Sequence, residues 1–295
     1  MTDARTITAA LGGRWSGGSG SACCPAHEDH SPSLSISDGA EGRLLLHCHA
    51  GCDFHDIMGA LRTHGIINGN RGFRAIGPIC RAQRKAIEQS DAVKRRQLAA
   101  SIWNAASPIA GTPAETYLRG RGITCALPLT LRYLRECWHQ NAGRCPALVS
   151  SIDITDRKAV AVHRIYIKDD GSAKAPISPA KAMLGPANGG AVHLSKAPGP
   201  LVVSEGIETG LSLLSGLLSG AASVWAALSA PGMKNLVLPP VPGELIIAAD
   251  GDPVGHAAAE ALANRAHALG WRVSMLPAPT GFDWNDVLTG KAVRT

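Results

Sequence analysis

Two stretches decide the fold of this chain: LVVSEGIETGLSLL at residues 201–214 and ELIIAADGDPVGHAAAEALA at residues 244–263. Each begins with a short apolar run of strand length and continues, past an acidic turn, into a segment with helical spacing. Strand-like runs at 223–228 and 272–277 continue the alternation. Strands and helices that alternate over short connections predict a mainly parallel sheet flanked by helices across residues 199–295.

Three acidic features lie where the apolar strands of this region end. Glu205 follows LVVS, Asp250 and Asp252 follow ELIIAA, and Asp283 and Asp286 come after the last strand. Because ligands of a parallel sheet gather beyond the carboxyl ends of its strands, we expect these carboxylates to converge. Clustered carboxylates repel one another unless a cation neutralises them, and their hard oxygen atoms favour Mg²⁺ or Mn²⁺.

The alternative for a single Asp-Gly-Asp turn is a solvated loop, and the repetition of acidic residues at successive strand ends favours the metal site instead. Gly251 is expected to let a ligand approach this turn closely. Glu208 and Glu260 lie one turn or more into the helices, and we expect both to be ordinary surface charges.

The N-terminal region contains two pairs of metal-ligand residues, CPAH at 24–27 and CHAGC at 48–52, separated by strand-like runs at 33–37 and 43–48. Tetrahedral zinc needs four such ligands, and each short spacing lets one turn supply two of them. The pattern predicts a zinc ribbon with a structural Zn²⁺. Its expected ligands are Cys24, His27, Cys48 and Cys52, and the neighbouring Cys23, His47 and His49 are alternatives for one of them.

Basic charge is concentrated in the middle of the chain. Residues 1–70 carry 4 Lys and Arg against 7 Asp and Glu, residues 71–200 carry 20 against 8, and residues 201–295 carry 5 against 8, for a total of +6. A net charge of +12 in the middle predicts a polyanionic partner such as nucleic acid. For the polar helix expected at about 80–106, a solvated connector is the alternative to direct contact with nucleic acid.

Composition argues against two broad classes of protein. A hydrophobic fraction of 45% and a mean hydropathy of +0.04 exclude a mainly disordered chain. The most apolar stretch, residues 211–230, is interrupted by Ser and Gly, so no membrane span is expected. The N-terminus lacks the pattern of a signal peptide, and we expect a cytoplasmic location.

The predicted fold class is α+β with α/β, in four parts. These are a zinc ribbon at 1–68, a basic helical linker at 69–106, a basic α+β part at 107–198 and the parallel-sheet domain at 199–295.

These parts resemble a known family of enzymes. Residues 199–295, from LVVSEG to DWNDVL, resemble the Toprim domain shared by DnaG-type primases, topoisomerases and some nucleases. CPAHEDHSPSLSI and LHCHAGCDF resemble the zinc ribbon of bacterial and phage primases, and YLRGRGI at 117–123 resembles an element of the primase catalytic core. The order of the parts is most similar to that of the phage- and plasmid-type primases.

The resemblance implies roles for individual residues. Glu205 looks like the family's acid/base or metal-binding glutamate, Asp250 and Asp252 like metal ligands, and Asp283 like the third acidic site. Asp286 departs from the pattern, since the family often has this Asp one residue earlier. The family also places basic residues toward template and nucleotide, at the positions of Arg121, Arg164, Lys174 and Lys181; for Arg164 and Lys174 a plain surface charge is the alternative.

The function implied is that of a DNA primase, which joins nucleoside triphosphates into short primers on single-stranded DNA with Zn²⁺ as a structural ion and Mg²⁺ or Mn²⁺ as the catalytic one. The chain has no GxxxxGK[ST] phosphate loop and stops nine residues after Asp286, so a helicase partner is expected to be a separate protein. Two alternatives stay open: a Toprim-type metal-dependent nuclease, and a non-catalytic zinc-ribbon accessory protein of a mobile element that binds nucleic acid.

Overall fold

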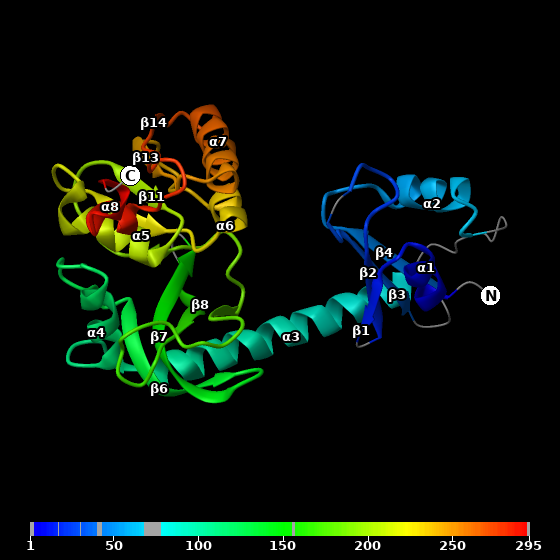
Figure 1. The fold of residues 1–295 in the computed structure, drawn as a ribbon, viewed down its shortest axis with the longest axis horizontal. Helices are drawn as coiled ribbons and strands as arrows, with labels where there is room; N and C mark the ends of the chain where they lie inside the picture. Colours follow the sequence, from blue (N-terminus) through cyan, green and yellow to red (C-terminus); the bar gives the residue numbers. More distant parts are fainter. Residues whose placement is uncertain are drawn as a thin grey trace. The chain divides into compact units, whose positions relative to one another are not determined.

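The computed structural model describes residues 3–16, 18–29, 31–39, 43–67, 78–154 and 157–293. The chain divides into two compact units, residues 1–77 and 78–295, and each is described by itself (Figure 1). Among the described helices, none is both long and apolar enough to cross a membrane.

The first unit is built on a four-stranded antiparallel sheet whose strands follow chain order. Its elements are α1 (Ala4–Ala10), β1 (Arg14–Ser16), β2 (Ser19–Ala22), β3 (Leu34–Gly39), β4 (Arg43–Cys48) and α2 (Phe54–Thr63). Ile57, Met58 and Leu61 form the buried face of α2. β1 and β2 pair as an antiparallel hairpin. Gly20 of β2 has no Cβ, and this lets Thr8 of α1 pack directly against the hairpin.

The second unit begins with a long helix and a five-stranded antiparallel sheet of order β5-β6-β7-β8-β9. Its elements are α3 (Pro78–Ala105), β5 (Ser107–Pro108), α4 (Pro113–Gly120), β6 (Leu131–His139), β7 (Gly143–Ile154), β8 (Arg157–Tyr166) and β9 (Lys181–Leu184). One face of the sheet packs against α3, where Ala99 and Ile102 contact a cluster that contains Val162 and Tyr166.

The other sheet of this unit has the order β10-β12-β11-β13-β14. Its strands are β10 (Val192–His193), β11 (Leu201–Ser204), β12 (Ser223–Ala226), β13 (Glu244–Ala248) and β14 (Arg272–Met275), and its helices are α5 (Ile207–Ser212), α6 (Ala230–Asn235), α7 (Pro253–Ala268) and α8 (Trp284–Leu288). All neighbouring strands are parallel except β10 and β12. The fold therefore has the mainly parallel sheet that the strand–helix alternation predicts. After α5 the chain continues into a π-helical turn at Leu213–Leu217, where Gly216 has a φ of 118°.

The two sheets of the second unit share one hydrophobic core. Leu148 and Ile165 from the antiparallel sheet belong to the same buried cluster as Val202 and Val224 from the parallel sheet. Ile207 of α5 completes this cluster beside them. The basic middle of the chain is thus packed against the layer that carries the acidic residues.

Candidate functional site

Glu205 and Asp250 meet at the carboxyl edge of the parallel sheet. Glu205 directly follows β11, and Asp250 lies two residues beyond β13. These two strands are parallel neighbours with Ser204 opposite Ala248, so the residues that follow them leave the sheet side by side. The Thr209 hydroxyl of α5 donates a hydrogen bond to Asp250 Oδ1 at 3.3 Å and holds that carboxylate toward α5.

Asp252 and Asp283 each cap the start of a helix at this edge. Asp252 Oδ1 accepts a hydrogen bond from the Gly255 amide at 2.6 Å, and Asp283 Oδ1 accepts one from the Asp286 amide at 2.8 Å. A carboxylate at this position is stabilised by the unpaired N–H groups of the first helical turn. Asp286 returns the bond to the Asp283 amide, and its Oδ1 lies 3.1 Å from Lys291 Nζ.

Gly251 fixes the loop that brings Asp283 to Asp250. Its amide donates to the Phe282 carbonyl at 2.9 Å, and its carbonyl accepts from the Gly281 amide at 2.8 Å. A Cβ on Gly251 would collide with the Pro279 carbonyl oxygen. The interpretation that this glycine makes room for a ligand is therefore wrong, because the space is filled by the protein's own main chain.

The acidic cluster, which we define as Glu205, Asp250, Asp252 and Asp283, concentrates negative charge in a partly buried place. Burial in the first place, and then the nearby Glu205 and Asp283 carboxylates, together raise the pKa of Asp250 to about 7. Burial and Asp252 also raise the pKa of Glu205, against the opposing effect of Lys181. Carboxylates that crowd one another in this way form an oxygen-rich site suited to a divalent cation such as Mg²⁺ or Mn²⁺.

Glu208 contradicts the prediction of a surface charge. It is only 5% exposed, in the first turn of α5. Its Oε1 accepts a hydrogen bond from the Tyr117 hydroxyl at 2.9 Å and lies 3.1 Å from Lys174 Nζ, and its Oε2 lies 3.8 Å from Lys181 Nζ. The structure thus brings Lys174 and Lys181 together beside the acidic cluster, through a residue that local sequence spacing assigns to the surface.

The two predicted arginines occupy different places. Arg121 ends α4 with its guanidinium 6.0 Å from the centre of the Tyr117 ring, close to Glu208. Arg164 is 7% exposed, and its Nη1 donates a hydrogen bond to the Trp138 carbonyl at 3.1 Å. Val162 and Tyr166 lie two residues before and after Arg164 on β8, and both face α3. Residues two apart on a strand share a face, so Arg164 lies on the sheet face turned away from Glu208. It holds strands of the sheet together and does not join the other basic residues.

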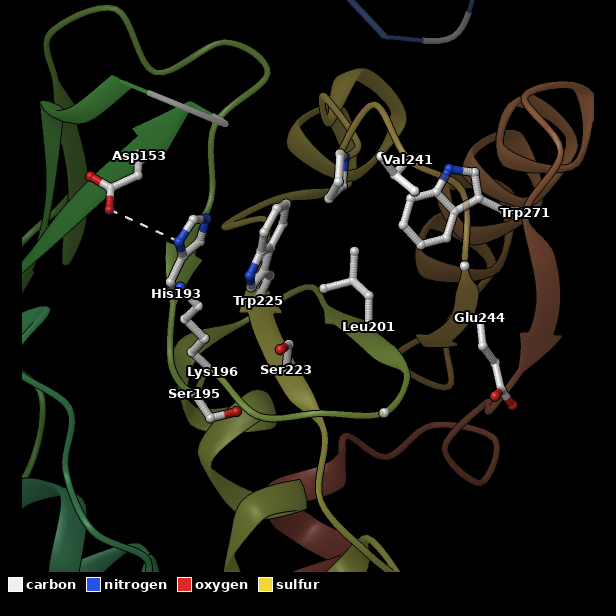
Figure 2. Close-up of a pocket in the computed structure, with 13 residues that line it drawn as sticks. Asp153, His193, Ser195, Lys196, Leu201, Ser223, Trp225, Val241, Glu244 and Trp271 are labelled. Atoms are coloured by element: carbon white, nitrogen blue, oxygen red, sulfur yellow. Dashed lines mark ion pairs between the residues drawn. The ribbon is translucent and has the colours of Figure 1, made fainter.

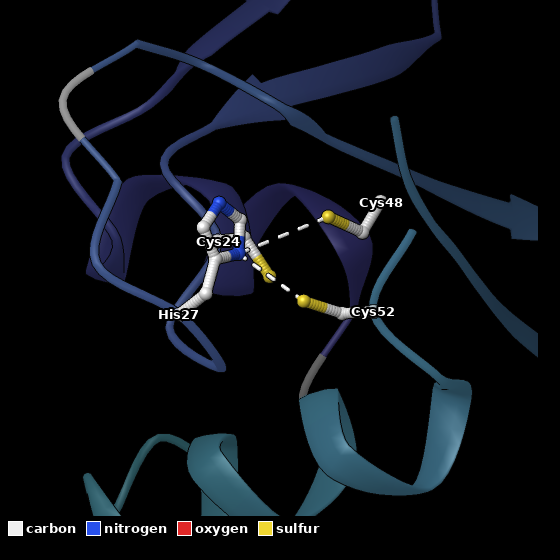
Figure 3. A group of neighbouring side chains, drawn as sticks. All are labelled: Cys24, His27, Cys48 and Cys52. Carbon is white, nitrogen blue, oxygen red and sulfur yellow. Dashed lines mark hydrogen bonds between the residues drawn. The ribbon is translucent and has the colours of Figure 1, made fainter. Parts of the chain in front are cut away.

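The first unit gathers the predicted zinc ligands (Figure 3). One ligand atom each from Cys24, His27, Cys48 and Cys52 lies within 4.8 Å of the others. His27 Nδ1 is 3.2 Å from Cys52 Sγ and 4.0 Å from Cys48 Sγ, against roughly 3.5–3.8 Å between ligand atoms around a tetrahedral zinc ion. The cluster fits a zinc site. His49 lies outside it and bonds to the Ser35 hydroxyl at 2.9 Å.

Asp29 supports this cluster and was not predicted from the sequence. Its Oδ2 accepts hydrogen bonds from the Cys24 amide at 2.7 Å and the Ser33 hydroxyl at 2.5 Å. The same oxygen lies 3.7 Å from His27 Nε2, the ring nitrogen that points away from the thiols. A carboxylate behind a histidine ligand is a common outer shell of zinc sites, and its position two residues after His27 is the sequence signal that could have found it.

Comparison with protein families identifies the domain that contains the parallel sheet. Residues 200–292 match the family model of the Toprim domain. The chain carries a Toprim domain. Residues 93–194, ahead of the Toprim domain, match a domain of unknown function, DUF7146. No curated protein matches the chain in sequence.

Among solved structures, the chain is similar to DnaG-type primases. A DNA primase domain from Pseudomonas aeruginosa is 16% identical, with a TM-score of 0.43 over 67% of this chain and 75% of that one. The zinc-binding and RNA polymerase domains of Aquifex aeolicus primase are 14% identical, with a TM-score of 0.45 over 99% and 80%. The primase fragment of the bacteriophage T7 primase-helicase protein is 12% identical, with a TM-score of 0.38 over 64% and 71%.

A cavity of about 570 Å³ lies at the opposite edge of the Toprim sheet (Figure 2). Leu201, Ser223 and Glu244, the first residues of three parallel strands, line it. The His193 imidazole stacks on the Trp225 indole in its wall, with ring centres 4.2 Å apart. Of the residues that the structure describes around this cavity, none belongs to the acidic cluster. It lies at the amino ends of the strands, away from the carboxylates.

Proposed function

We propose that this protein is a DNA primase that makes short primers on single-stranded DNA by metal-dependent nucleotidyl transfer. The observation that carries the proposal is the meeting of opposite charges at one edge of the Toprim sheet. The acidic cluster lies there beside Lys174 and Lys181, and Lys181 interacts with Glu205 as well as with Glu208. A nucleoside triphosphate with its divalent cation needs both kinds of group.

The residues divide the chemistry between them. Glu205, Asp250, Asp252 and Asp283 would hold Mg²⁺ or Mn²⁺, which when bound offsets negative charge on the phosphates. In the reaction, a nucleotide 3′-oxygen forms a bond to the α-phosphorus of the next triphosphate. The bond between that phosphorus and the bridging oxygen breaks, and pyrophosphate leaves with the electron pair. The hydroxyl proton passes to solvent or to a carboxylate of the cluster.

Basic residues would hold the phosphates during this step. Phosphate contacts position a nucleic acid or nucleotide without specifying its sequence. Arg121, Lys174 and Lys181 suit this role, since the two lysines contact Glu208 and Arg121 lies against Tyr117, the hydrogen-bond donor to Glu208. Arg164 is not assigned to it, because its guanidinium is buried against the Trp138 carbonyl.

The zinc unit would engage the single-stranded template, and the partners would be DNA, nucleoside triphosphates and a separate replicative helicase in the cytoplasm. A closed four-ligand zinc site supplies folding free energy rather than chemistry. The zinc cluster is therefore assigned to template binding through the unit that it folds.

One assay tests the proposal. The protein is incubated with single-stranded DNA, Mg²⁺ or Mn²⁺ and labelled nucleotides, beside the variants Glu205→Gln and Asp250→Asn and the control Glu260→Gln, whose side chain is exposed on α7. Template-dependent oligomers, made by wild type and control and lost in the two site variants, are expected. Shortened DNA would instead indicate a Toprim nuclease, and binding without product an accessory protein. Normal synthesis by Glu205→Gln would contradict the site.

A further inference from the structure

Glu208 is a charged side chain in a buried place. It lies on a helix whose six residues are all buried, between the acidic cluster and the antiparallel sheet. A buried ion pair is often no more stabilising than well-packed apolar side chains of similar volume, because desolvation cancels much of the attraction. A carboxylate at this point therefore calls for a reason beyond stability.

Glu208 needs Lys174 and Lys181 to stabilise its charge, whereas the two lysines do not need Glu208 for theirs to be solvated. Glu208 has a 6% exposed side chain, so without cations its charge would lack solvation. The side chains of Lys174 and Lys181 are 33% and 44% exposed, and water can solvate them without Glu208. Removing the carboxylate would leave both ammonium groups in contact with water but without the anion that holds them in place. What depends on Glu208 is therefore their location.

Each ammonium group keeps donors for a further ligand. A lysine has three N–H donors, so the contact with Glu208 leaves at least two on each lysine for a further ligand. The two contacts use different carboxylate oxygens, Lys174 at Oε1 with 3.1 Å and Lys181 at Oε2 with 3.8 Å. The Tyr117 hydroxyl fixes Oε1 from a third direction at 2.9 Å. Two cations around one anion leave a net positive charge next to the acidic cluster.

We propose that Glu208 is a positioning residue for phosphate binding. Its carboxylate fixes the ammonium groups of Lys174 and Lys181 beside the acidic cluster, so that both receive the phosphates of a nucleoside triphosphate. The inference rests on the proposed function for the identity of that ligand. Glu208 itself touches no substrate in this assignment, and acts through the two lysines.

The test uses the full-length protein and the substitution Glu208→Gln, which preserves side-chain shape and an acceptor for Tyr117 but removes the charge. Binding of ATP with Mn²⁺ is measured by calorimetry, and the KM and kcat of primer synthesis are measured beside it. We expect Kd and KM to rise about tenfold and kcat to change less than about threefold, as for the loss of one charge-assisted positioning contact. Glu260→Gln is the matched control and should bind ATP as wild type does.

A double-variant comparison separates positioning from a general effect on the fold. In a background with Lys174→Met and Lys181→Met, Glu208→Gln should add less than about a twofold further change, because the groups that it positions are gone. An equal tenfold loss in that background would mean a structural role and would overturn the proposal. Should Glu208→Gln fail to fold, Tyr117→Phe, which removes one donor to Oε1, is expected to raise Kd about two- to threefold by the same route.

The remaining outcomes are also decisive. Unchanged ATP affinity in Glu208→Gln, or no ATP binding by the wild-type protein, overturns the positioning role. ATP binding that depends on Glu208 in a wild-type protein that makes no primers keeps the positioning role and rejects the primase instead.

Discussion

Asp250 gives the sharpest quantitative prediction, because its charge is the most unfavourable in the acidic cluster. Its pKa is raised from 3.8 to about 7, by burial first and then by Glu205 and Asp283. Roughly 1.4 kcal/mol per unit converts this shift to about 4 kcal/mol, and solvent screening at a partly exposed carboxylate reduces it to about 2 kcal/mol. Replacing Asp250 by Asn should therefore stabilise the second unit at pH 8 in the absence of divalent cations.

The direction in which folding stability changes with pH follows from proton binding. The folded protein holds the Asp250 proton more tightly than the unfolded chain, so wild-type stability falls as the pH rises from about 4 through about 7. The advantage of Asp250→Asn should accordingly be absent near pH 4 and complete near pH 8. Saturating Mg²⁺ should stabilise the wild-type protein more than the variant, since the cation removes the repulsion in wild type alone.

Urea unfolding followed by tryptophan fluorescence measures this effect, because five of the six tryptophans belong to the second unit. A difference of about 2 kcal/mol moves the midpoint by about 1 M urea. Asp91→Asn on the exposed surface of α3 is the control and should leave the midpoint unchanged. Equal midpoints for wild type and Asp250→Asn at pH 8 without Mg²⁺ would refute the charge-crowding explanation, as would equal stabilisation of both proteins by Mg²⁺.

Three further predictions concern the zinc cluster and the loop at Gly251. Cys48→Ser, or removal of zinc by a chelator, should unfold residues 1–77 because zinc binding is worth about 10–16 kcal/mol to so small a core, and circular dichroism would detect it; an unchanged spectrum would reject the zinc site. Asp29→Asn should weaken zinc binding about 10- to 100-fold while the four ligands remain, measured by competition with a chromogenic chelator; unchanged affinity would mean that Asp29 only shapes the turn. Gly251→Ala should lower the stability of the second unit by about 1–3 kcal/mol and abolish synthesis, since its Cβ meets the Pro279 carbonyl; normal stability would show that the loop adapts.

The positions of Glu205 and Asp250 could be predicted from the sequence because they depend on a rule that needs no contact information. Apolar runs of strand length identify β11 and β13, and parallel pairing sends both strand ends to one edge. The zinc ligands were predictable for a similar reason, since each pair of ligands shares one short turn.

Glu208 could not be placed in this way. Its burial depends on Lys174 and Lys181 and on Tyr117, which is 91 residues away in sequence, and such distant partners leave no trace in helical spacing. The signal that was present is the composition of α5, IETGLS, in which Glu208 is the single carboxylate among apolar or small residues. A helix without a polar face is buried on all sides, so a charge on it must have partners.

Arg164 was expected near the ligand because the resemblance placed it among residues that face template and nucleotide. Strand periodicity instead puts it on the same face as Val162 and Tyr166. The β1–β2 hairpin was not predicted because its Gly/Ser-rich sequence lacks apolar alternation, and Gly20 allows close packing with α1 instead.

The hydrophobic core shared by the two sheets of the second unit limits how this protein can exchange parts in evolution. Leu148, Ile165, Val202 and Val224 pack in one cluster, so a recombination junction near residue 199 would separate apolar surfaces that fit each other. In such a hybrid, the inner face of the Toprim sheet would pack against side chains whose shapes do not match it. The hydrophobic cluster described for residues 1–77 draws its members from that unit alone. We therefore expect residues 1–77 to be exchangeable without dividing that cluster, and the antiparallel sheet and the Toprim domain to be exchangeable only together.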